Sequence, residues 1–230
     1  MKRTLAIAVL VSLAGCSMPA RNAEPPDQAK KPEPPTLAGG MMVPDFPADW
    51  VGHWKGSGAT MSGGNFTYHF TLELDIQPIA RPDGTMPPSP GSVHHSAKPG
   101  DRYTWKMTYT DRADKSKPAD VREYQVVVRD PAMGEFVIDE GAGVELVANE
   151  LMGSVHSAFS VGEQQLVASY VFNPDTKYDV IEMRIATFKP GDQKPVGDAA
   201  QGIRSGPVQS LQACGLVRWK PAKENQAKGK

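Results

Sequence analysis

Residues 66–76 read FTYHFTLELDI, and this stretch decides the fold. Apolar side chains at Phe66, Tyr68, Phe70 and the following even-numbered positions alternate with Thr, His, Glu and Asp. A side-chain period of two is typical of a β-strand with one face in an apolar core and the other face in water. The stretch therefore predicts a long strand whose even-numbered side chains point inward.

The same alternation recurs along the chain. In residues 102–110 the apolar positions Tyr103, Trp105, Met107 and Tyr109 alternate with Arg, Thr and Lys. Further strands, each closed by turn residues, are expected at 121–129, 135–139, 144–151, 155–161, 166–172, 178–188 and 211–219. No long stretch has a helical period, so the sequence predicts an all-β domain. The expected architecture is an antiparallel up-and-down β-barrel of about eight to ten strands, because closure removes exposed strand edges.

Residues 51–58, VGHWKGSG, mark the start of the first strand. The pattern Gly52, Trp54, Gly56 and Gly58 resembles the first strand of the calycin barrels, which include lipocalins, fatty-acid-binding proteins and nitrobindin-like domains. Residues 207–218, PVQSLQACGLVR, resemble the last strand of nitrobindin-like domains. The resemblance implies that Trp54 plugs one end of the barrel. The glycines then allow a bent strand and close backbone approach at this corner.

The resemblance also implies that the barrel interior holds a small apolar ligand. The interior candidates are the aromatic and Met side chains on the apolar faces of the predicted strands. They are Tyr68, Phe70, Trp105, Met107, Tyr109, Phe159, Tyr170 and Phe172, with Met183 expected beside them. These residues predict either a lined pocket or a filled core, because a barrel of this size encloses side chains and at most about one ligand.

Haem is not expected, although nitrobindins ligate haem iron through a histidine in the last strand. The resemblance places Leu211 at or near that position, and leucine cannot ligate iron. The alternation puts His69 and His156 on polar, exterior faces, and it leaves the direction of His53 open. The pair His94-His95 falls in the proline-rich segment 78–100, which we interpret as a mobile loop. The sequence therefore predicts neither a cofactor nor a metal.

Enzyme motifs are missing from the sequence, and we expect no catalytic residues. There is no Gly-x-Ser-x-Gly elbow, phosphate-binding loop or His-Glu-x-x-His motif. The carboxylates of Asp139-Glu140 and Glu145 flank a glycine turn, where charges are ordinarily solvated. His156 and Ser157 are strand neighbours and point to opposite faces. Cys214 has no nearby base in its sequence and is expected to be buried.

The first sixteen residues predict the location of the protein. Basic residues Lys2 and Arg3 precede an apolar run, 4–14, that is too short to span a bilayer. The following Leu-Ala-Gly-Cys, residues 13–16, resembles the lipobox of bacterial lipoproteins, which implies a signal peptide (1–15) and a lipidated Cys16. The resemblance also implies three acyl chains on Cys16, which would anchor the protein stably to a membrane. In lipoproteins of this class an Asp after the cysteine retains the protein in the inner membrane, so the resemblance implies that Ser17 favours the outer membrane, with the protein on its periplasmic side.

The remaining segments complete the expected organisation. A lipidated cysteine and Pro-rich linker (16–48) lead to the barrel domain (49–221), and a basic tail (222–230) follows. Nucleic acid is not an expected partner, because the net charge is −1 and basic residues are not interleaved with aromatic ones. A transmembrane barrel is disfavoured by the charged polar faces. Two functions remain: an anchored binding protein for a small apolar ligand, or a structural or assembly lipoprotein that contacts envelope partners.

Overall fold

The structure is a computed structural model that describes residues 43–90, 97–173, 179–198, 200 and 202–219. Cys16, the pair His94-His95 and the basic tail lie outside these residues. The described chain forms a closed antiparallel barrel of 10 strands, which confirms the predicted fold class.

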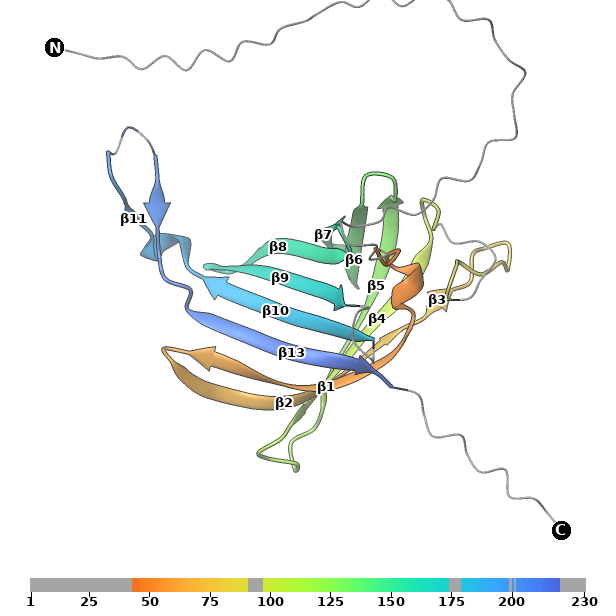
Figure 1. The fold of residues 1–230 in the computed structure, drawn as a ribbon, viewed down its shortest axis with the longest axis horizontal. Helices are drawn as coiled ribbons and strands as arrows, with labels where there is room; N and C mark the ends of the chain where they lie inside the picture. The colour runs from red at the N-terminus through yellow and green to blue at the C-terminus, as the bar shows by residue number, and fades with distance from the viewer. Residues whose placement is uncertain (1–42, 91–96, 174–178, 199, 201, 220–230) are drawn as a thin grey trace, which may run out of the picture. The chain divides into compact units, whose positions relative to one another are not determined.

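The barrel strands follow one another along the chain (Figure 1). Most connections are short, but residues 77–101 and 189–209 form two longer ones. They are β1 (Gly52–Ser62), β2 (Asn65–Ile76), β4 (Arg102–Asp111), β5 (Asp120–Asp130), β6 (Glu135–Gly141), β7 (Val144–Leu151), β8 (Ser154–Val161), β9 (Gln164–Asn173), β10 (Val180–Phe188) and β13 (Ser210–Arg218). The short strand β3 (Pro78–Ile79) pairs with β4, and β11 (Lys194–Pro195) pairs with β12 (Arg204–Ser205). Each strand predicted from residue 66 onward is present, with small differences at the ends.

Strand β1 closes the barrel because it pairs on both sides. Trp54 lies opposite Leu74 of β2 and Arg218 of β13, so the first and last long strands meet. On the far side of β2, the ladder continues into β4, where Leu72 lies opposite Tyr109. The strand order is therefore that of an up-and-down meander.

Alternating polarity fixes which side of each strand faces inward. In β2, Phe70, Leu72, Leu74 and Ile76 are 0–1% exposed, while the residues between them remain in contact with solvent. The prediction was wrong for Phe66, which is 65% exposed, because the register of β1 and β2 shifts between Thr60 and Met61. The outward side chains form ion pairs across neighbouring strands, such as Lys55–Glu73 at 2.6 Å. Exposed pairs of this kind contribute little to stability, so burial of the inner face holds the barrel together.

One end of the barrel is closed by the segment that leads into β1 together with the first residues of that strand, which we call the plug (residues 45–54). Phe46 and Trp50 are 4% and 0% exposed, and a 3-10 helix at Ala48–Trp50 turns the chain into the barrel mouth. The Phe46 ring lies 4.8 Å from that of Phe136, edge to face. The linker assigned to residues 16–48 therefore extends too far, because Phe46 and Ala48 are buried in the core.

The expected barrel-end motif occupies the same region. Trp54 is 1% exposed, and its indole Nε1 donates to the carbonyl of Trp50 at 2.8 Å. The guanidinium of Arg218 lies 4.1 Å from the centre of the Trp54 ring. Arg218 also donates to the backbone carbonyls of Val51 and Asp49, so it ties the last strand to the plug.

The glycines of β1 permit close approach to the neighbouring strand. A Cβ on Gly56 would lie 1.8 Å from the carbonyl oxygen of Gly215, and one on Gly58 would lie 2.4 Å from that of Ala213. Larger residues would push β1 away from β13, as expected for a strand corner.

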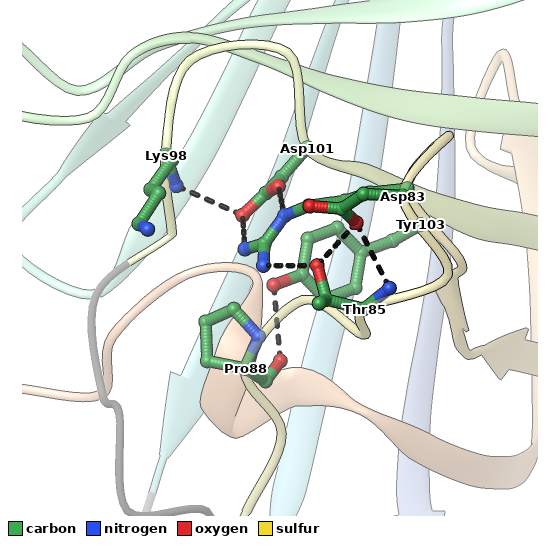
Figure 2. A network of polar contacts seen from close by, with 7 residues as sticks. Asp83, Thr85, Pro88, Lys98, Asp101 and Tyr103 are labelled. Carbon is green, nitrogen blue, oxygen red and sulfur yellow. Dashed lines mark hydrogen bonds and ion pairs between the residues drawn. The ribbon is translucent and has the colours of Figure 1, made fainter.

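The described parts of the 78–100 segment are fixed to the barrel, contrary to the interpretation as a mobile loop. Buried Asp101 accepts from Arg81 at 2.6 and 2.9 Å and from the backbone N–H of Lys98 at 2.9 Å (Figure 2). Burial opposes ionisation of Asp101, but these hydrogen bonds outweigh it and hold the pKa of its carboxyl below the usual value. The Tyr103 hydroxyl donates to the carbonyl of Pro88 at 3.0 Å (Figure 2).

Candidate functional site

Most of the predicted interior residues form a filled core rather than the wall of a pocket. Six of the eight candidates are 0–8% exposed: Phe70, Trp105, Met107, Tyr109, Tyr170 and Phe172. The rings of Trp105 and Tyr170 meet edge to face at 5.1 Å, and Phe70 lies 5.3 Å from Tyr109. Met183, 0% exposed, packs against the Tyr109 hydroxyl at 3.9 Å. A space large enough for a ligand would leave accessible surface on these side chains, and they have very little.

Burial in the core raises the pKa of Tyr109 to about 12, and it raises the pKa of Tyr170 still further. Both hydroxyls, already neutral near pH 7 at the ordinary tyrosine pKa, therefore stay neutral hydrogen-bonding groups in more alkaline solution as well.

Tyr68 and Phe159, the other two candidates, lie nearer the end of the barrel opposite the plug, which we call the distal end. Both are only partly buried and pack against the core. Tyr124, Leu146 and Ile185 have the same intermediate burial. The distal part of the barrel therefore presents aromatic and aliphatic surface that the core does not cover.

Cross-strand pairing arranges part of this surface as a row around the inner wall. The row runs through Tyr68, Thr60, Gln212, Ile185, Ala168 and Ser157. Its polar members interrupt the apolar surface with a few hydrogen-bonding groups, an arrangement typical of small-molecule sites. Leu211, which the resemblance places at the haem-ligand position, points to the outer face because its neighbour Gln212 points inward.

Arg122 is a candidate residue that the sequence analysis missed. It lies opposite Met107 in the β4–β5 ladder, and Met107 faces the core. The Arg122 guanidinium stacks over the Tyr109 ring, 5.0 Å from its centre. It also donates to Asp120 at 2.8 and 3.1 Å. Burial favours the neutral form, but the Asp120 carboxylate outweighs it and raises the pKa of Arg122. A permanent positive charge therefore stands beside the inner tyrosines.

The histidines within the described residues all lie on the outer wall. His69 is exposed, as predicted, and His53 pairs with Asp75 at 3.0 Å on the same outer side. His156 faces outward, as predicted, and its Nδ1 lies 3.0 Å from the Ser169 hydroxyl on β9. Among the described residues, no group of three His, Cys, Asp or Glu side chains could hold a metal ion.

Two of the three carboxylates considered as acid or base groups, Asp139 and Glu145, are engaged in ion pairs at the surface. Asp139 pairs with Arg102 at 3.2 Å, and Glu145 pairs with Arg129 at 2.9 Å. Ser157 points inward and donates to the carbonyl of Val147 at 2.7 Å, on the face opposite His156. Cys214 is buried, and burial raises the pKa of its thiol to about 11, which disfavours the reactive thiolate.

The fold has a counterpart among solved structures. The S-type phycobiliprotein lyase CPES from Guillardia theta superposes with a TM-score of 0.50 and 8% sequence identity, over 75% of this chain and 89% of that chain. The two chains share a barrel fold, consistent with the expected calycin-like fold class. At this identity the likeness shows the fold alone. No family model and no curated protein matches the sequence.

A helix long and apolar enough to cross a bilayer is not found within the described residues.

Proposed function

We propose that the protein is an outer-membrane-anchored periplasmic lipoprotein whose calycin-like barrel binds a small apolar ligand at its distal end. The single observation that carries the binding proposal is that the two ends of the barrel interior differ in burial. The core beside the plug is filled, whereas Tyr68, Tyr124, Leu146, Phe159 and Ile185 remain partly accessible. An apolar molecule that covered these side chains would gain about 25 cal/mol per Å² of surface removed from water.

Arg122 narrows the chemistry of the proposed ligand. Its guanidinium lies between solvent and the ring of Tyr109, and it keeps about half of its side-chain surface exposed, at 47%. A guanidinium donor beside apolar surface favours a ligand that has an apolar body and a hydrogen-bond acceptor, while Asp120 already balances the charge of Arg122.

The anchoring part of the proposal depends on the sequence of residues 13–16, Leu-Ala-Gly-Cys, and on Ser17. The acyl chains on Cys16 would insert into the membrane, which is therefore one of the partners that we propose.

The test is native mass spectrometry of the protein purified from its membrane, together with extraction and analysis of lipids. A co-purifying small molecule is the expected result. In a second experiment, binding of 1-anilinonaphthalene-8-sulfonate, an anionic apolar fluorescent probe, is measured by titration into the purified protein. Phe159→Ala should weaken probe binding by at least about tenfold, which corresponds to about 1.4 kcal/mol. Val147→Ala is the matched control, because Val147 is an apolar residue exposed at 65% on the outer wall.

The filled core favours the second candidate function, a structural or assembly lipoprotein that contacts envelope partners. A barrel that purifies empty, and that binds the probe equally well in the Phe159→Ala and Val147→Ala proteins, would support this second function and contradict ligand binding.

A further inference from the structure

The outer wall of the barrel contains a polar hollow of about 210 Å³ that is separate from the interior. We call it the tryptophan hollow, after Trp219 at its edge. Its wall is made by side chains that face outward from three neighbouring strands: His53 and Lys55 of β1, Glu73 and Asp75 of β2, and Lys106 and Thr108 of β4. Thr108 is the shortest of these side chains, and it lies opposite Glu73 in the ladder.

Trp219 is held on the outer face at the end of the last strand. Its backbone N–H donates to the carbonyl of His53 at 2.7 Å, which continues the pairing of β13 with β1. Since Arg218 points inward to Trp54, the next residue must point outward. Trp219 is 52% exposed, and Lys55 Nζ lies 6.0 Å from its ring centre.

The other tryptophans of the described residues show how unusual this exposure is. Trp50, Trp54 and Trp105 are 0–1% exposed. A large aromatic side chain left half in water beside a hollow offers an apolar surface on which a ligand can stack.

The polar groups of the hollow are balanced in charge and rich in both donors and acceptors. Lys55 and Glu73 meet at 2.6 Å, and His53 and Asp75 meet at 3.0 Å. Lys106 is paired with Glu123 at 2.6 Å, beyond the hollow. Because both lysines have a carboxylate partner, the hollow does not favour an anion. It favours a neutral ligand that both donates and accepts hydrogen bonds.

We propose that the tryptophan hollow binds one ring of a neutral saccharide. The apolar face of the ring stacks on Trp219, and its hydroxyl groups bond to Lys55, Glu73 and Asp75. Hydrogen bonds to ionised side chains are stronger than those between neutral groups, which suits a polyhydroxylated ligand. The volume is below the roughly 300–1,000 Å³ of drug-sized pockets, so it fits one ring, with the rest of a chain in solvent. This site is independent of the ligand proposed for the distal end.

The test uses two neutral oligosaccharides, chitotriose and maltotriose, titrated into the purified protein. Because the other described tryptophans are buried, acrylamide quenching reports mainly on Trp219. The expected result is saturable protection from quenching by at least one sugar, with a Kd of about 1 mM or below.

Two variants locate the binding, measured by saturation-transfer NMR because one of them removes the fluorophore. Trp219→Ala should abolish binding, and Thr108→Arg should weaken it at least about tenfold by filling the hollow. Phe66→Ala is the matched control, since Phe66 is an aromatic residue exposed at 65% elsewhere on the surface. Thermal melts show whether each variant is folded. If Thr108→Arg does not fold, Trp219→Phe takes its place as the second variant, and it should retain measurable binding because it keeps an aromatic ring.

Two results would overturn the proposal: no saturable binding of either sugar up to about 10 mM, a concentration tenfold above the expected Kd, or binding that is unchanged in the Trp219→Ala protein. An empty barrel in native mass spectrometry leaves this site unaffected, so failure of the two proposals can be distinguished.

Discussion

Replacing Trp54 by alanine should destabilise the barrel by about 3–5 kcal/mol, the range for truncation of a large buried aromatic residue. Trp54 is 1% exposed and packs edge to face on Phe172, with ring centres 5.5 Å apart. The change also removes the hydrogen bond to the Trp50 carbonyl and the stack with Arg218. Because domains are stable by only about 5–15 kcal/mol, such a loss is a large fraction of the total.

Urea denaturation followed by circular dichroism measures this effect. Trp54→Phe keeps an aromatic ring but loses the indole donor, so we expect a smaller cost of about 1–2 kcal/mol. A double-mutant cycle of Trp54→Leu, which removes the ring, with Arg218→Met then gives the coupling between ring and guanidinium, expected at about 0.5–1 kcal/mol. Trp219→Ala, at a half-exposed position, should change stability by less than about 0.5 kcal/mol. A Trp54→Ala effect below about 1 kcal/mol would refute the assignment of Trp54 to the plug.

Four further predictions follow from separate parts of the molecule. Gly56→Ala should lower stability by about 1–3 kcal/mol or more because its Cβ meets the Gly215 carbonyl, whereas Gly215→Ala, with nothing within 4 Å of the new Cβ, should be nearly neutral; thermal melts compare the two. Burial, followed by the charges of Asp49 and Glu150, raises the pKa of Asp45 to about 6, so the protonated form is favoured on folding and stability falls as pH rises from about 4 to 6. Asp45→Asn should therefore gain stability relative to the parent protein across that window, by no more than about 1 kcal/mol because the residue keeps exposed surface, and a difference that is constant with pH would contradict this sign. Purified protein should be colourless and show no Soret band on haem titration. A stoichiometric Soret shift that a single His→Ala change abolishes would contradict this prediction. Cys16→Ala should prevent labelling by a clickable fatty acid and release the protein from outer-membrane fractions, and equal labelling of both proteins would exclude lipidation at Cys16.

The alternation of residues was enough to predict the barrel. Phe70, Trp105 and Tyr109 were expected to face inward, and all are buried, because a period of two fixes the face of successive residues in a regular strand. The rule failed at Phe66, beside the register shift between β1 and β2. The same rule placed His69 on the exterior. Turn residues predicted where the strands end, because the backbone preferences of Gly and Pro interrupt a strand without the help of distant contacts.

The plug and the distal end could not be predicted in this way. Phe46 lies in a short segment between prolines that has no periodicity, and its burial depends on Phe136, far away in the sequence. Whether Trp105 lines a pocket or fills the core depends on how closely the inward side chains of different strands pack against one another. Arg122 could have been found, because continuing the alternation of Tyr124 and Val126 backward puts this charged residue on the inner face. The position of Trp219 beside Lys55 depends on the closing ladder, which no local pattern specifies.

The closing ladder between β1 and β13 also constrains when the protein can fold. Arg218 bonds to the carbonyl of Asp49, and 169 positions separate the two residues. Contacts of such long range must overcome a large loop-closure entropy before they stabilise the fold, so barrel formation should be slow, on the order of milliseconds to seconds. A chain that emerges from a translocation channel with its N-terminus first cannot complete the barrel until its last strand has crossed. For the exported lipoprotein that we propose, late closure would leave the barrel incomplete until the whole chain has crossed the membrane.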